Sequence, residues 1–114
     1  MTDLQMLERA AKELEMMDTA PESLPAPLVY VLETAAGNVY TIFNNDCQKT
    51  LDTLAQAGDT VVTKMVAMWE GECVDVPSYA FRKALLELDD ANRQTKVLLR
   101  SESGYITKPM GSML

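Results

Sequence analysis

Histidine is absent from the 114-residue sequence. It is the usual general base beside a nucleophilic serine or cysteine, and it is the commonest metal ligand in proteins. Without it, neither a Ser-His-Asp nor a Cys-His arrangement can form. A zinc site would have to be built from cysteines and carboxylates alone. The composition therefore excludes most hydrolase mechanisms.

Cysteine and long apolar runs are also scarce. Cys47 and Cys73 are the only cysteines and form no Cys-x-x-Cys pair, so free thiols are expected in a reducing compartment. No stretch approaches the ~20 apolar residues that cross a bilayer. The acidic, amphipathic N-terminus lacks the pattern of a signal peptide. We therefore expect a cytoplasmic protein.

Basic residues are in the minority. The chain has 10 Lys and Arg against 17 Asp and Glu, for a net charge of -7. The basic residues are spread along the sequence, and a phosphate backbone or an anionic membrane would be repelled by the remaining charge. Neither a nucleic acid nor a membrane is an expected partner.

What the sequence does contain is typical of one globular domain spanning residues 1–114. Apolar residues make up 47% and charged residues 24%, and this length can bury a core without cross-links. Apolar periodicity and turn residues predict the elements in this order: helix 3–17, strands 28–32 and 39–43 joined by a Gly37-Asn38 turn, helix 46–57, strand 61–69, a short extended piece 74–76, a helix capped by Ser78 that fades at 89–92, strand 96–99 and an extended piece 105–107.

An initial hairpin followed by β-α-β alternation predicts an α/β fold in α-β-α layers. The expected sheet is mixed, has about five strands and is covered by three helices. Within it, Trp69 is expected to end a central strand and Phe81 to lie in the core. Arg82 and the acidic run at 87–90 are expected to be solvated.

The element order and four local segments resemble the cytidine deaminase family. Gly37-Asn38-Val39-Tyr40-Thr41 resembles the Gly-x-x-Tyr-Thr pattern of the family's first hairpin, and Asn44-Asn45-Asp46 resembles its Asn-x-Glu segment. Cys47-Gln48-Lys49 stands where the family has Cys-Ala-Glu or His-Ala-Glu. Pro77-Ser78-Tyr79-Ala80-Phe81-Arg82 stands where it has Pro-Cys-x-x-Cys-Arg.

The resemblance implies a zinc site, and the residues at the matching positions depart from it. Three ligands would acidify a zinc-bound water, and a glutamate would shuttle its proton. Cys47 could be one ligand, but Ser78 and Phe81 occupy the positions of the two cysteines, and Lys49 occupies the position of the glutamate. A degenerate member is expected, with no metal, no cofactor and no zinc-dependent deaminase activity.

One part of the family's ligand site is partly kept. The Asn-x-Glu pair binds ribose in the family, so the resemblance makes Asn44 and Asp46 candidate ligand-binding residues. In this chain Asp46 directly precedes Cys47, whereas the family has a loop there. Capping of the following helix is the simpler explanation of these residue types, and the sequence favours it over a retained ribose contact.

The resulting hypothesis is a non-catalytic module that binds a small, nucleoside-like ligand or a protein. A homodimer or higher homo-oligomer is expected, with Trp69, Tyr79 and Phe81 extending an apolar surface.

The alternative is a regulatory or structural dimerisation protein of the profilin-like, roadblock-type α+β fold. A parallel relation between strands 61–69 and 96–99 favours the deaminase-like fold, and antiparallel neighbours favour the alternative. Thiol chemistry centred on Cys47 and Asp46 is a third possibility. The sequence has no histidine, so it offers no obvious base for this chemistry.

Overall fold

The computed structural model describes residues 2–17, 28–43, 47–69, 73–102 and 104–113. The elements follow the predicted order: α1 Asp3–Met17, β1 Leu28–Thr34, β2 Val39–Phe43, α2 Cys47–Ala57, β3 Val62–Trp69, β4 Cys73–Asp75, α3 Tyr79–Leu88, the 3-10 helix η1 Asp90–Gln94, β5 Lys96–Ser101, β6 Gly104–Pro109 and the 3-10 helix η2 Met110–Met113. The α/β fold class and the mixed sheet predicted from the sequence are confirmed.

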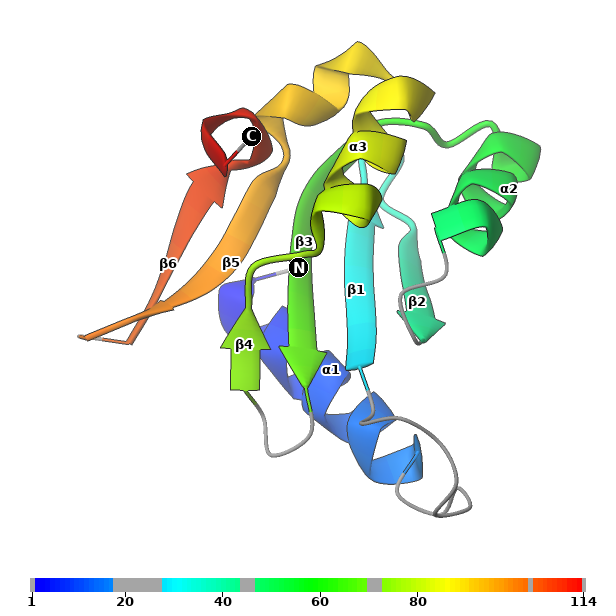
Figure 1. Ribbon diagram of the computed structural model, residues 1–114. Coiled ribbons are helices and arrows are strands. Elements are labelled where there is room, and N and C mark those ends of the chain that lie inside the picture. The colour runs from blue at the N-terminus through cyan, green and yellow to red at the C-terminus, as the bar shows by residue number, and fades with distance from the viewer. Residues whose placement is uncertain (1, 18–27, 44–46, 70–72, 103, 114) are drawn as a thin grey trace.

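The six strands form one sheet with the order β2-β1-β3-β5-β6, and the short β4 pairs with the end of β3. All neighbours are antiparallel except β3 and β5, which are parallel, with Lys64 opposite Lys96 and Met65 opposite Val97. The chain passes from β3 through α3 to β5, as Figure 1 shows. This parallel pair is the relation that favours the deaminase-like fold over the profilin-like alternative.

Helices cover both faces of the sheet (Figure 1). On one face, α1 packs Met6, Ala10 and Leu14 against β1 and β3. On the other, α2 and α3 cover a larger cluster that includes Leu54 and Phe81. The near-continuous apolar runs of β1 and β3 follow from this arrangement, because a central strand covered on both faces has no solvated side.

Glycines with positive φ end two elements. Gly37, with φ of 88°, lies in the predicted turn between β1 and β2. Gly58, with φ of 66°, ends α2, and its amide donates to the carbonyl of Ala55 while the Asp59 amide donates to that of Leu54. This pair of bonds is the Schellman arrangement that glycine favours. It turns Asp59 back toward the β1–β2 hairpin.

The segment after α3 was predicted to be a fading helix end with solvated acidic residues, and the structure differs at Asp89. Asp89 caps η1 by accepting from the Ala91 amide at 3.0 Å, and its other oxygen accepts from the Thr60 hydroxyl at 2.9 Å. An acidic residue that follows one helix can thus cap the next. Its charge alone does not distinguish such a cap from a solvated side chain.

Asn92, inside η1, is fully buried and joins three segments. Its Oδ1 accepts from the Val62 amide at 2.7 Å, and its Nδ2 donates to the carbonyls of Thr60 and Leu85 at 3.0 and 2.8 Å. The start of β3 and the end of α3 are therefore held together by one amide side chain, which uses its acceptor and both donors.

Candidate functional site

The start of α3 is organised by Pro77 and Ser78. Pro77 is buried, and Ser78 has the extended backbone of an N-cap, with φ of -58° and ψ of 154°. The Ser78 hydroxyl accepts from the Phe81 amide at 3.2 Å. The role of Ser78 as helix cap, predicted from the sequence, is confirmed. One acceptor position of its oxygen is already used by the backbone.

Phe81 lies in the core between the sheet and α3. Its side chain is 0% exposed and stacks on Tyr30 of β1, with ring centroids 3.9 Å apart and ring planes 20° from parallel. The predicted core position of Phe81 is confirmed. Its expected share in an exposed apolar surface is wrong, because only Tyr79 (63%) and Trp69 (37%) of the three expected residues are exposed.

The start of α2 lies on the same face of the sheet as α3 (Figure 1). Cys47 is the first residue of α2, and Lys49 is exposed in its first turn. Asn44 and Asp46, the candidate ligand-binding residues, lie outside the described residues, as does the side chain of Cys47.

The described residues do not fit a zinc site at the start of α3. The Ser78 oxygen is engaged by a backbone amide, and the phenyl ring of Phe81 has no lone pair to offer. Among the described parts of the chain, no group of three or more Cys, Asp or Glu side chains could hold a metal ion. Ser78 and Phe81 therefore do not supply the zinc ligands that the resembled motif has at these positions.

Arg82, predicted to be solvated, is instead half-buried and contacts the C-terminal turn. Its Nη1 donates to the carbonyl of Met113 in η2, and its guanidinium lies 5.9 Å from the centroid of the Tyr79 ring. Its Nε is buried and has no hydrogen-bond partner within the described residues. The start of α3 is thereby tied to η2, a contact between distant residues that sequence spacing does not reveal.

A polar cluster that the sequence did not indicate surrounds Asp59. Its Oδ2 accepts from the Thr34 hydroxyl at 2.6 Å, the Asn38 amide at 2.9 Å and the Tyr40 hydroxyl at 3.2 Å. The hydrogen bonds from Thr34 and Asn38 hold the pKa of Asp59 below its ordinary value. Desolvation, with the neighbouring Asp59, raises the pKa of Tyr40. The cluster fastens the end of α2 to the hairpin.

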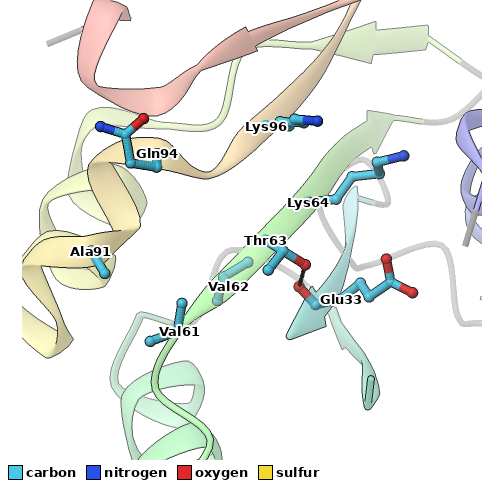
Figure 2. A pocket seen from close by; sticks show the side chains of 8 residues that line it. All are labelled: Glu33, Val61, Val62, Thr63, Lys64, Ala91, Gln94 and Lys96. Carbon is cyan, nitrogen blue, oxygen red and sulfur yellow. Dashed lines mark hydrogen bonds between the residues drawn. The ribbon is translucent and has the colours of Figure 1, made fainter. Parts of the chain in front are cut away.

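One cavity, of about 410 Å³, lies at the beginning of β3 (Figure 2). Lys64, Lys96 and Glu33 extend to one side of the strands there, with Gln94 and Ala91 on η1 at the other. Lys64 forms an ion pair with Asp3 at 2.6 Å. Thr63 donates its hydroxyl to the carbonyl of Glu33. None of the residues lining this cavity belongs to the candidate site at the start of α3.

No protein-family model matches the sequence, and the search of curated proteins found no significant match. Solved structures do match. Cytidine deaminase from Burkholderia pseudomallei superposes with a TM-score of 0.71 at 19% identity, and the match covers 100% of this chain and 97% of that one. The chain has a cytidine deaminase-like fold.

Two further structures agree with this assignment. The cytidine deaminase from Mycobacterium leprae gives a TM-score of 0.69 at 15% identity, covering 100% of this chain and 98% of that one. The enzyme from Mycobacterium tuberculosis gives 0.68 at 16% identity, covering 100% and 95%. Identities this low establish the cytidine deaminase-like fold alone. No helix within the described ranges is long and apolar enough to cross a membrane.

Proposed function

We propose that this chain is a degenerate, non-catalytic domain of the cytidine deaminase-like fold that binds a ligand or partner without converting it. The observation that carries the proposal is the Phe81–Tyr30 stack, which fills with carbon the position at which the resemblance puts a zinc ligand. A phenyl ring packed at 3.9 Å on a second ring leaves no space for a cation between them.

Two further positions support the loss of chemistry independently. The Ser78 hydroxyl is the cap of α3, and Lys49 stands where the resemblance puts the proton-shuttling glutamate. An ammonium group there would repel a bound cation and could not accept a proton from zinc-bound water. Departures from the resembled motifs at α2 and at the start of α3 thus both oppose zinc-dependent deamination.

A small, nucleoside-like molecule is the ligand that we assign to this module. The support is the amide and carboxylate at Asn44 and Asp46, which keep the hydrogen-bonding character of the resembled ribose-binding pair. A protein ligand is the second candidate, supported by the exposed Tyr79 beside Arg82 at the start of α3. The profilin-like alternative is not favoured, because β3 and β5 are parallel.

The experiment is a pair of measurements on one preparation. Cytidine is incubated with the purified protein, with and without added Zn²⁺, and uridine formation is followed. Binding of cytidine and uridine is measured by calorimetric titration to the wild type and to Asn44→Ala and Asp46→Ala. We expect no turnover, and nucleoside binding that both variants weaken. Turnover would contradict the loss of catalysis. Absence of nucleoside binding would contradict the ligand assignment and leave the protein ligand.

Self-association completes the proposal. We assign the functional form to a homodimer or higher homo-oligomer in the cytoplasm, without nucleic acid or membrane as partner. Its support is the net charge of -7 together with the exposed apolar side chains of Leu4, Tyr79 and Tyr105, since symmetric association is the commonest way to cover such residues.

A further inference from the structure

The cavity at the beginning of β3, of about 410 Å³, has a charged end and an uncharged end (Figure 2). Lys64 and Lys96 extend to one side of the strands at the charged end. The uncharged lining comes from η1 and from the residues that precede or begin β3: Val61, Val62, Ala91 and Gln94. A volume of this size, with apolar walls and a few polar groups, is ordinary for a small-molecule site.

The charged residues of the cavity form one row across three neighbouring strands. Glu33 of β1 lies opposite Lys64 of β3, and Lys64 lies opposite Lys96 of β5. Val66 and Leu98, two residues further along β3 and β5, belong to the cluster under α1. Because side chains alternate between the faces of a strand, Lys64 and Lys96 share the face that α1 covers.

The two lysines place like charges side by side. Neighbouring strands lie about 4.8 Å apart, so ammonium groups that extend from directly opposite residues repel each other. Asp3 offsets the charge of Lys64 through an ion pair at 2.6 Å. Lys96 is exposed, faces the uncharged Pro109 on its other side, and has no ion pair with an acidic side chain in the described part of the chain. A positive charge is therefore left at this end of the cavity.

We infer that this cavity binds a small organic anion that has one carboxylate or phosphate group and a compact apolar body. The oxyanion would accept from the ammonium group of Lys96, beside the positive charge of Lys64, in the strong type of hydrogen bond that joins charged groups. The apolar body would lie against the uncharged lining. Glu33, at the far end of the row, would repel a second anionic group.

This site is separate from the function proposed above, because none of its lining residues belongs to the start of α3. A cation is the less suitable occupant, since it would meet two lysines in the row against one glutamate. An uncharged molecule would leave the charge of Lys96 without a partner. The chemistry of the lining thus selects one anionic group and no more.

The test titrates the full chain with four simple probes. Benzoate and phenyl phosphate each carry one oxyanion group and a ring, whereas acetate lacks the ring and benzamide lacks the charge. Binding is measured by calorimetric titration and is located by shifts of the amide NMR signals. We expect benzoate, phenyl phosphate or both to bind about tenfold more tightly than acetate and benzamide. The tighter of the two identifies the head group.

The NMR signals of residues 61–64 and 94–96 should shift on binding, and those of 78–81 should not. No binding of benzoate or phenyl phosphate would overturn this site, as would binding no tighter than that of benzamide. Shifts confined to 78–81 would also overturn it. Each of these results would leave the function proposed for the start of α3 standing.

Lys96→Gln tests the charged end of the cavity. It should raise the dissociation constant of the tighter probe about tenfold. Lys108→Gln is the matched control: Lys108 is exposed on β6 and lies opposite Val97, which belongs to the cluster under α2 and α3, so its side chain points to the opposite face. This variant should bind as the wild type does, and circular dichroism checks that both variants are folded. Equal weakening in the two variants would reduce the effect to net charge and overturn the site.

Discussion

Tyr30 and Phe81 stack with their ring centroids 3.9 Å apart, which joins β1, where Tyr30 lies opposite Ala67 of β3, to the first turn of α3. Both side chains are at most 1% exposed. The contact therefore has a structural role that a metal site would not have: it packs the helix onto the sheet through dispersion and apolar burial.

Truncating this stack should destabilise the fold strongly. Phe81→Ala removes a fully buried ring, and we expect a loss of about 3–5 kcal/mol in the free energy of unfolding. Phe81→Leu, which keeps most of the volume, should lose less. Denaturant unfolding followed by circular dichroism measures both. If Phe81→Ala unfolded at the wild-type midpoint, the ring would not be the core residue that we describe.

Ser78→Ala should cost about 1 kcal/mol of unfolding free energy, because the Phe81 amide loses its acceptor at the N-terminus of α3. Ser78→Asp, whose carboxylate can accept the same bond and interacts favourably with the helix dipole, should retain most of the stability. The same denaturation experiment compares the two. Equal losses in both variants would show that the hydroxyl does more than cap the helix.

The Asp59 cluster predicts a specific dependence of stability on pH. The pKa of Asp59 is lowered by folding, so the unfolded chain binds more protons in the acidic range and stability falls as pH falls. The contribution is complete above the unfolded pKa of about 4 and is lost below it, as pH passes through the folded-state pKa. Asp59→Asn should be less stable than the wild type at pH 7, with the difference shrinking as the pH is lowered.

Unfolding free energies of the two proteins between neutral and acidic pH measure that difference. A constant difference over the whole range would contradict the assignment of the effect to the Asp59 carboxylate. Tyr40 supplies the opposite case, since its raised pKa means that its contribution is lost as pH rises above about 10. Tyr40→Phe should therefore be less sensitive to alkaline pH than the wild type.

Asn92→Ala should destabilise the protein by about 3 kcal/mol, because the Val62 amide and two carbonyls lose their partner in the interior. Gln94→Ala, an exposed position in the same 3-10 helix, is the control and should stay within about 0.5 kcal/mol of the wild type. Thermal unfolding distinguishes them. Similar melting temperatures for the two variants would contradict the role of Asn92 in holding β3 and α3 together.

Local signals in the sequence were sufficient for most of the fold. The apolar runs of β1 and β3, the Gly37 turn and the Ser78 cap each depend on nearby residues, and each lies where it was predicted. The parallel pairing of β3 and β5 agreed with the β-α-β alternation. The core position of Phe81 also followed from its spacing in the helix.

Contacts between distant residues were beyond this reasoning. Nothing local indicates that Tyr30 is the partner of Phe81, that Arg82 reaches the Met113 carbonyl, or that Asp59 collects donors from the hairpin. Asp89 was expected to be solvated because it belongs to a run of charges, yet it bonds Thr60. Such pairings depend on how elements cross in space, which composition and periodicity do not encode.

Zinc content per chain is the measurement that tests the loss of chemistry most directly. The wild type is expressed in zinc-supplemented medium and purified without chelator, and its zinc is determined by elemental analysis, beside a variant with Ser78→Cys and Phe81→Cys. These substitutions restore thiolate ligands to the two positions that the resemblance assigns to zinc. We expect the wild type to hold far less than one zinc ion per chain and the variant to hold more. A wild type that purifies with one zinc ion per chain would contradict the account.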